Sequence, residues 1–293
     1  MGGHKEATNE REKTMTDHLA TVAQSNMIDL PAGRFHYLSW GAEQTDYPCV
    51  LLLHGITSSA LSWVRVGPAL ANRYRVYALD MRGHGDSVKP LPGVYSLRQT
   101  ADDALAFMQA LGLKQPVLIG HSWGGATALV LATGAGGVQP APAFPRIILE
   151  DPAVDFGRGD LQERVATFIK DIGRPTEELR TELWATSPGW TAADIEGKLD
   201  ALSKVSREAV ISVFAEAGLM GSLLPLFARL PAPTLLIRAD PALGTTMDEV
   251  VWEQARHSLP SHSLAVQIDG ATHNIHRSSF EAFMQVVSDF LAS

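Results

Sequence analysis

The sequence predicts an α/β fold, in which a mostly parallel, eight-stranded sheet is flanked by helices and a helical segment is inserted into the chain. Two observations lead to this prediction. Short apolar runs alternate along the chain with segments whose apolar residues have helical spacing. The composition, with 45% hydrophobic and 19% charged residues, is typical of a globular domain with a large core.

The expected strands and helices follow one another in the order that produces a parallel sheet. Strands are expected at residues 27–30, 34–40, 49–53, 74–79, 116–119, 146–149, 234–237 and 264–268. Helices are expected at residues 62–70, 96–111, 125–132, 248–258 and 278–291. The first two strands are joined by the turn signal Pro31-Ala32-Gly33 and are expected to form a hairpin.

Composition divides the chain into three regions. Residues 1–26 are polar and lack periodicity, so we expect a disordered N-terminal tail. Residues 27–154 and 226–293 carry the alternation of strands and helices and form the expected core domain. Residues 155–225 contain several helical stretches and no β-like run. They are too long for a plain connection, which predicts a helical cap.

Charge and cysteine content narrow the classes of partner. The formal net charge is −8 and no basic cluster occurs, so we expect no nucleic acid partner. No apolar run reaches the ~18 residues of a membrane span and no signal peptide is visible, so we expect no membrane association. The single cysteine, Cys49, lies in an apolar run and suits a reducing, cytoplasmic location. No Cys/His cluster has zinc spacing, so no metal is expected.

The most informative stretch of the chain is Gly120-His121-Ser122-Trp123-Gly124. It lies between an expected buried strand and a helix of small residues, which is the context of a nucleophile elbow. The turn is too tight for side chains at the two glycines, and a strained backbone would push the Ser122 hydroxyl clear of the sheet. N–H groups at the start of the helix would favour negative charge there. We therefore predict Ser122 as a catalytic nucleophile.

A serine hydroxyl needs a base within hydrogen-bond reach to become nucleophilic. His273 follows the last expected strand and should emerge at the same sheet edge as Ser122, so it is the predicted base. His276, three residues further on, could compete with it. His121 precedes the nucleophile and is expected to support the elbow.

The oxyanion of an acyl-transfer intermediate needs two N–H donors. One is expected from Trp123, directly after the nucleophile. The other is expected from Ile56, in the loop after the strand at residues 49–53, where Gly55 lets the backbone approach a ligand.

The carboxylate that orients the histidine stays open in the sequence. Glu150 ends an apolar strand, where an unpaired carboxylate costs several kcal/mol, and Asp240 follows the next strand. Either could reach a histidine at the sheet edge. The structural alternatives are an ion pair of Glu150 with an arginine of the cap and an Asp-Pro turn at Asp240. Asp151 and Asp248 are weaker candidates.

Taken together, these motifs resemble the α/β-hydrolase fold family over residues 27–293. The resemblance rests on His54-Gly55, the polar loop at residues 80–87, residues 120–125 and Gly270-Ala271-Thr272-His273, in the family's order. It implies the fold but no substrate, because this fold supports many chemistries. The family usually places its acid as Gly-x-x-Asp after the strand that follows the cap, whereas this chain has Arg238-Ala239-Asp240-Pro241 there. Some members instead place the acid after the preceding strand, at the position of Glu150. Epoxide hydrolases and haloalkane dehalogenases use an aspartate nucleophile, which Ser122 argues against.

The sequence therefore predicts a cofactor-independent serine hydrolase that cleaves a carboxylic ester or lactone of a small, largely apolar molecule through an acyl-enzyme. Trp184 and Trp190 of the cap, with Gly55, are expected to line the substrate pocket. Two alternatives stay open. One is a carbon–carbon bond hydrolase, and the other is a non-enzymatic small-molecule sensor on the same scaffold. Turnover of a substrate would separate the sensor from the enzymes.

Overall fold

The structure is a computed structural model that describes residues 22–139, 143–156 and 160–293. The predicted tail, residues 1–26, falls mostly outside the described residues. The predicted end of the tail at residue 26 is too late, because residues 24–26 already belong to the first strand and pair with residues 37–39 of the second.

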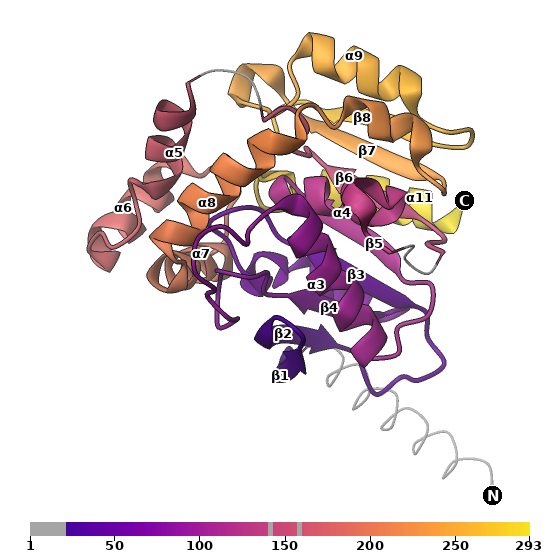
Figure 1. The fold of residues 1–293 in the computed structure, drawn as a ribbon, viewed down its shortest axis with the longest axis horizontal. Coiled ribbons are helices and arrows are strands. Elements are labelled where there is room, and N and C mark those ends of the chain that lie inside the picture. The colour runs from indigo at the N-terminus through magenta and orange to yellow at the C-terminus, as the bar shows by residue number, and fades with distance from the viewer. Residues whose placement is uncertain (1–21, 140–142, 157–159) are drawn as a thin grey trace, which may run out of the picture.

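Eight strands form one mostly parallel sheet, which confirms the predicted fold class (Figure 1). Their order is β1-β2-β4-β3-β5-β6-β7-β8. The pairs β1–β2 and β2–β4 are antiparallel, and the other five pairs are parallel. The strands are β1 (Gln24–Leu30), β2 (Gly33–Trp40), β3 (Cys49–Leu53), β4 (Arg75–Leu79), β5 (Val117–His121), β6 (Ile147–Glu150), β7 (Thr234–Ala239) and β8 (Leu264–Ile268).

Helices cover both faces of this sheet. The α-helices are α2 (Val66–Leu70), α3 (Leu97–Ala110), α4 (Trp123–Thr133), α5 (Leu161–Ile169), α6 (Thr176–Thr186), α7 (Ala192–Lys204), α8 (Arg207–Ala217), α9 (Glu249–Ser258), α10 (Ile275–Ser278) and α11 (Phe280–Ala292). The 3-10 helices are η1 (Ala60–Trp63), η2 (Ala135–Gly137), η3 (Gly218–Met220), η4 (Leu224–Arg229) and η5 (Pro241–Leu243). The helix predicted at residues 62–70 is divided into η1 and α2.

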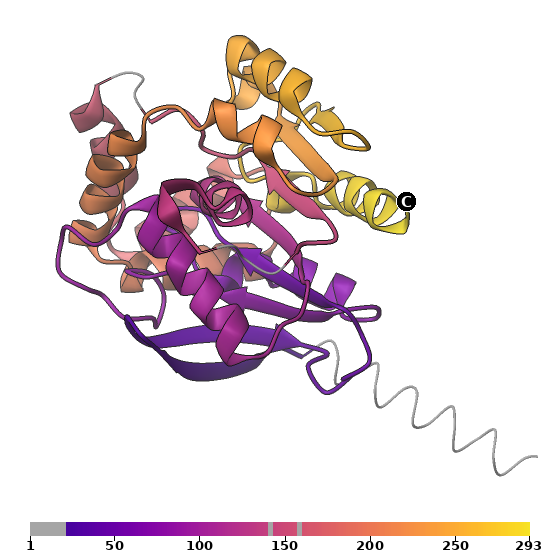
Figure 2. The same cartoon turned by 45° about the vertical axis from the view of Figure 1, so that its right-hand side comes forward.

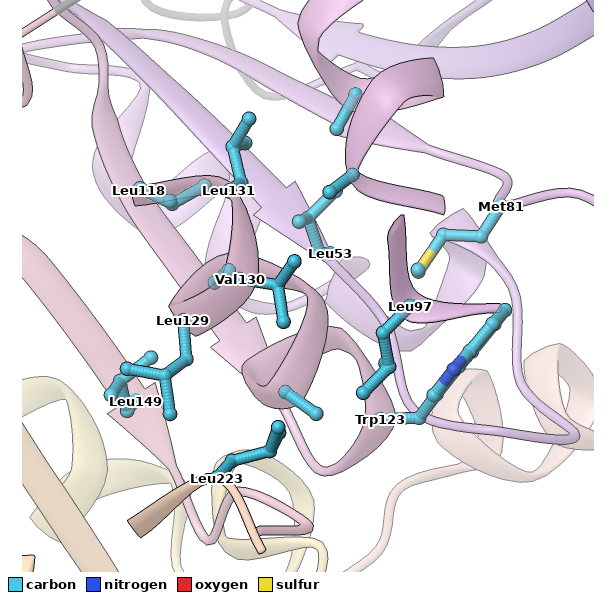
Figure 3. Close-up of a cluster of buried hydrophobic side chains, with 14 of the residues drawn as sticks. Leu53, Met81, Leu97, Leu118, Trp123, Leu129, Val130, Leu131, Leu149 and Leu223 are labelled. Atoms are coloured by element: carbon cyan, nitrogen blue, oxygen red, sulfur yellow. The ribbon is translucent and has the colours of Figure 1, made fainter. Parts of the chain in front are cut away.

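Side chains of the central strands alternate between two hydrophobic clusters, one on each face of the sheet. On β3, Leu51 and Leu53 belong to the first cluster and Val50 and Leu52 to the second, because successive residues of a strand point to opposite faces. Helices α3, α4 and α9 complete the first cluster, whose packing around Trp123 is drawn in Figure 3. Helices α2 and α11 complete the second. Because both faces are covered, these parallel strands have unbroken apolar sequences.

The chain between β6 and β7 contains α5 to α8 together with η3 and η4. In both views the four α-helices lie together at one end of the sheet (Figures 1 and 2). Helix α5 packs on α8, and α6 packs on α7. A bridge between Asp155 and Ser222 joins the two ends of the segment. This arrangement agrees with the predicted helical cap, while its limits at residues 155 and 225 stay a prediction.

Among the helices that the structure describes, none combines the length and the hydropathy needed to cross a bilayer.

Candidate active site

Ser122 occupies a sharp turn between β5 and α4. Its backbone angles, φ 53° and ψ −117°, lie outside the regions that L residues normally adopt, so the turn stores strain at this residue. A Cβ at Gly120 would collide with the backbone of Gly124, and one at Gly124 would collide with the backbone of Leu53. Only glycine fits at either position, as the sequence predicts for a nucleophile elbow.

The structure brings Ser122 and His273 together. Ser122 Oγ lies 2.9 Å from His273 Nε2, and His273 Nδ1 lies 2.6 Å from Asp151 Oδ2. Since a carboxylate can only accept, Nδ1 carries the proton and Nε2 is free to accept from the serine hydroxyl. The three side chains therefore form a Ser-His-Asp array with the hydrogen-bond directions that proton removal from the serine requires.

The sequence prediction of Glu150 as the orienting carboxylate is wrong by one residue. Glu150 ends β6 and its side chain points to the other side of the strand, where both oxygens contact His276 Nδ1 at 2.8 and 2.9 Å. Its Oε1 also accepts from the His276 backbone N–H. Asp151 is the next residue, and its φ of 38° turns its carboxylate towards His273. Glu150 thus has the partner that a buried carboxylate requires, but this partner is His276 and not the predicted base His273.

Asp151 is held rigidly in its orienting position. Its carboxylate accepts from the Thr246 backbone N–H at 3.0 Å, the Thr245 hydroxyl at 2.5 Å and the Ala239 backbone N–H at 3.4 Å, in addition to His273. These donors come from β7 and the segment after it. The sequence analysis offered this part of the chain as a source of the acid, at Asp240, but it instead supplies the donors that position Asp151.

Asp240, the other predicted acid, lies in a turn away from His273. Its Oδ1 accepts from the Ala242 N–H at 2.9 Å and its Oδ2 from the Gly270 N–H at 2.8 Å. The bond from Gly270, followed by that from Ala242, lowers the pKa of this carboxyl. The Asp-Pro turn that the sequence offered as the alternative is therefore what the structure contains. Asp248 caps the N-terminus of α9 by accepting from the Val251 N–H.

The two predicted oxyanion donors lie beside the serine. Trp123 is the first residue of α4, so its N–H has no acceptor within the helix. Ile56 lines the same cavities as Ser122. The loop that carries Ile56 is fixed by His54, whose Nδ1 donates to the Gly55 carbonyl at 2.8 Å and whose Nε2 accepts from the Met81 N–H at 3.0 Å. Burial lowers the pKa of His54, so it stays a neutral brace.

Gly55 is required by the close approach of His121. A Cβ at Gly55 would lie 2.7 Å from His121 Nδ1 and 3.2 Å from Ser122 Cβ. His121 Nε2 donates to the backbone carbonyl of His273 at 2.9 Å, which ties the elbow to the histidine loop as predicted. Burial lowers the pKa of His121 well below its usual value, so this ring is neutral.

Two cavities meet at Ser122, which lines both of them together with Ile56 and Phe168. The larger has a volume of about 320 Å³ and a mainly apolar wall. Val213 and Phe214 of α8 contribute to this wall. The smaller cavity, of about 90 Å³, lies on the side of His273, and eight of its eleven lining residues have polar side chains.

One group of three possible metal ligands occurs in the described part of the chain, formed by His36, Asp80 and Asp86. Its central carboxylate is already occupied. Asp80 Oδ2 contacts His36 Nδ1 at 2.7 Å and accepts from the Asp86 N–H, while Oδ1 accepts from the Ala60 N–H at 2.6 Å. These bonds brace the polar loop at residues 80–87 and leave the Asp80 carboxylate little capacity for an ion.

Comparison with known proteins agrees with this geometry. The family model described as alpha/beta hydrolase fold matches residues 48–278. The chain belongs to the α/β-hydrolase fold family. It is 28% identical to N-formylmaleamate deformylase of Pseudomonas putida over 278 residues. This match covers 93% of this chain and 98% of that protein. The enol-lactonase of Burkholderia xenovorans LB400 superposes with a TM-score of 0.71 at 22% identity, covering 92% of this chain and all of the other.

A third relative matches only in part. Bifunctional epoxide hydrolase 2 of Sus scrofa is 43% identical over 109 residues, which are 36% of this chain and 19% of that protein. All three relatives are hydrolases by name, which supports a hydrolase of this family.

The prediction that Trp184 and Trp190 line the substrate pocket is wrong for this α/β-hydrolase chain, whereas Gly55 does line the smaller cavity. Trp184 is 54% exposed and lines neither cavity, and Trp190 packs beside Arg277 instead. The cap contributes Phe168 of α5 and Phe214 of α8, whose ring centroids lie 5.0 Å apart. Aromatic residues in the cap were visible in the sequence, but which of them face the serine depends on how α5 and α8 pack.

Two cationic residues of the smaller cavity, Lys198 and Arg277, were also missed. The only signal for Arg277 was its place four residues after His273, on the short helix α10. Nothing local marks Lys198, because α7 reaches the site only through the fold of the cap.

Proposed function

We propose that this protein is a cofactor-independent serine hydrolase that cleaves a carboxylic ester or lactone of a small molecule through an acyl-enzyme. The observation that carries the proposal is the Ser122–His273–Asp151 array, with contacts of 2.9 and 2.6 Å, at the junction of two cavities. The enol-lactonase with the same fold and the deformylase, which also acts at a carbonyl group, favour this chemistry.

In the first half-reaction, Ser122 Oγ attacks the substrate carbonyl carbon while His273 Nε2 takes its proton. The Asp151 carboxylate stabilises the imidazolium that forms. The N–H groups of Ile56 and Trp123 donate to the developing oxyanion, and each such donor contributes roughly 3 kcal/mol of transition-state stabilisation. The carbonyl then re-forms and the alcohol leaves with the proton from His273.

In the second half-reaction, water takes the place of the alcohol. His273 removes a proton from the water, which attacks the acyl carbon of the ester on Ser122. Collapse of the intermediate releases the carboxylic acid and returns the proton to Ser122. A lactone follows the same two steps, except that its alcohol stays attached to the acyl group.

The test is covalent labelling combined with turnover. The protein is treated with a fluorophosphonate probe, digested and analysed by mass spectrometry, and p-nitrophenyl acetate and butyrate hydrolysis are measured in parallel. We expect one adduct, on Ser122, and hydrolysis of both esters. Ser122→Ala should lose the adduct and the hydrolysis together, whereas Ser62→Ala, the matched buried serine, should keep both.

Other outcomes identify the alternatives. No adduct and no turnover by a folded protein would contradict the proposal and favour a small-molecule sensor. An adduct on Ser122 without ester turnover would contradict an esterase and favour the hypothesis of a carbon–carbon bond hydrolase.

A further inference from the structure

The smaller cavity beside Ser122 contains two cationic side chains for which hydrolysis alone gives no role. Lys198 of α7 and Arg277 of α10 both line it, together with the nucleophile and His273. None of its lining residues is an aspartate or a glutamate. The cavity therefore presents positive charge directly next to the reacting groups.

Arg277 is buried without a matching acceptor. The residue is 1% exposed, and its Nε has no hydrogen-bond partner among the described residues. Its Nη2 makes a single long bond of 3.4 Å to Ser58 Oγ. The Trp190 ring supports the guanidinium from one side, with its centroid 4.5 Å from Cζ. A guanidinium has five N–H donors, so most of the hydrogen-bonding capacity of Arg277 is unused.

Lys198 is positioned but not neutralised. Its Nζ donates to the Thr57 carbonyl at 2.8 Å and to the Thr57 hydroxyl at 2.9 Å. An ammonium group has three N–H donors, so one remains for a ligand. The backbone of Thr57 adopts a φ of 56°, which is uncommon for a threonine and places both acceptors under the lysine.

The nearby carboxylates form no ion pair with either cation. Across the described ranges, none lies within ion-pair distance of Lys198 or Arg277. Asp194 Oδ2 contacts Arg65 at 3.3 Å and closes the capping box of α7, while its Oδ1 has no hydrogen-bond partner among the described residues. Glu150 contacts His276, and both carboxylates act on Arg277 only at longer range.

The pKa values reflect this imbalance. Burial, together with the positive charge of Arg277, lowers the pKa of Lys198 to about 7. Burial lowers that of Arg277 to about 10, although Asp194 and Glu150 oppose the shift. An anion between the two cations would relieve both effects.

We propose that this cavity binds a carboxylate of the substrate between Lys198 and Arg277, so that the substrate is an anionic ester or lactone. This inference rests on the proposed function for its reaction, and it specifies the substrate class. A volume of about 90 Å³ admits a carboxylate and a short linker but no large group. The apolar cavity of about 320 Å³ then receives the other side of the scissile bond.

The first test measures binding without turnover. Ser122→Ala protein is titrated calorimetrically with glutarate and with glutaramide, its neutral counterpart of the same size. We expect glutarate to bind at least roughly tenfold more tightly, as a charge-assisted hydrogen bond implies. Adding Lys198→Met or Arg277→Gln should abolish this preference. Adding Lys204→Met, which removes a lysine on the same helix that contacts Asp86 and Asp200 instead, should not.

The second test measures turnover of matched esters by the parent enzyme. Mono-p-nitrophenyl glutarate carries the carboxylate, and p-nitrophenyl 5-methylhexanoate replaces it with an isopropyl group. After correction for spontaneous hydrolysis, we expect kcat/KM to be higher for the anionic ester. The ratio of the two values should fall roughly tenfold or more in Lys198→Met, and should be unchanged in Lys204→Met.

Failure of the inference and failure of the proposed function give different results. Hydrolysis of the neutral ester with no anion preference and no glutarate binding would overturn the anion site and leave the serine hydrolase intact. Glutarate binding that depends on Lys198 and Arg277, without turnover of either ester, would support the anion site and contradict the proposed function. Because Arg277→Gln also removes packing on Trp190, circular dichroism of that variant and the independent result from Lys198→Met keep the test decisive.

Discussion

Three Ser-His-carboxylate arrays occur among the residues that the structure describes. One of them, Ser25-His36-Asp80, lies at β1 and β2 with contacts of 2.9 and 2.7 Å, and the other two are neighbours with nearly the same dimensions. In one of these neighbours, Ser122, His273 and Asp151 are linked at 2.9 and 2.6 Å. In the other, Ser62 Oγ lies 2.9 Å from His276 Nε2, and His276 Nδ1 lies 2.8 Å from Glu150. The carboxylates are consecutive in the sequence and the histidines are three residues apart, so the two arrays lie back to back.

The difference between the two neighbouring arrays is their access to a substrate. The His273 side chain is 26% exposed and borders a cavity, whereas the His276 side chain is 1% exposed. His276 stacks on Trp63 at 4.5 Å, within the hydrophobic cluster that α11 completes. Ser122 also lies on a strained turn at the start of α4, next to the predicted oxyanion donors, whereas Ser62 belongs to η1. Distances between side chains therefore do not identify an active site unless a cavity and oxyanion donors accompany them.

The largest expected effect separates the two serines. Ser122→Ala removes the nucleophile, so kcat for p-nitrophenyl butyrate should fall by roughly 10⁴-fold or more. Ser62→Ala removes one buried hydrogen bond, which should cost about 1 kcal/mol of stability and leave kcat near the parent value. Steady-state kinetics and urea denaturation measure both quantities. A comparable loss of kcat in both folded variants would mean that the buried array takes part in the reaction.

The next largest effect separates Asp151 from Asp240, one of the two acids between which the sequence left the choice open. In Asp151→Asn, an amide replaces the acceptor that fixes the His273 tautomer, and kcat should fall by roughly 10³–10⁴-fold. Asp240→Asn alters only a turn and should retain kcat, with any change confined to stability. The comparison is made at one pH with the same ester. Loss of activity in Asp240→Asn alone would contradict the assignment of the acid.

These two substitutions show where the sequence reached its limit. Ser122 and its glycines could be predicted because the strand–turn–helix context is local, and His273 because strand ends meet at one sheet edge. The acid could not be chosen, because Glu150, its weaker rival Asp151 and Asp240 all lie at the ends of apolar strands. Which of them faces His273 depends on the positive φ of Asp151 and on donors from the segment after β7.

The fold could be predicted because its signal is local in the sequence, whereas the arrangement of the cap depends on packing between distant segments. Buried parallel strands such as β3 carry apolar residues at every position, and this signal is independent of their neighbours. The cap helices are short and partly exposed, so their sequences fix their existence but not their packing. Trp184 was therefore expected over the site and lies 54% exposed, while Phe168 takes its place.

A smaller effect concerns the role of the buried array in stability. Glu150→Ala would leave the His276 N–H and Nδ1–H without an acceptor and open a cavity, which should cost about 3 kcal/mol of unfolding free energy. Asp240→Ala removes a cap from η5 at the surface and should cost about 1 kcal/mol or less. Urea denaturation at pH 7.5 measures both. If the two losses were equal, the buried array would not be a structural element of the core.

The smallest effect is the pH dependence that the buried histidine imposes on stability. Burial lowers the pKa of His276 well below its usual value, and Arg277 lowers it further. Below about pH 6.5 the unfolded chain therefore takes up a proton that the folded state refuses, so stability falls as the pH falls. His121, also depressed, acts in the same direction, whereas burial raises the pKa of Glu150, which opposes the trend.

Replacing His276 isolates its share of that trend. Between pH 7.0 and 5.5, the parent should lose about 1 kcal/mol more unfolding free energy than His276→Gln, which has no proton to take up at this position. Ser62→Ala keeps His276 and should show the parent's slope. Urea denaturation of the three proteins at both pH values gives the comparison. If the unfolding free energy of His276→Gln changed with pH as much as that of the parent, His276 would be protonated in the folded state. The buried array would then contain an imidazolium–carboxylate ion pair instead of a neutral imidazole.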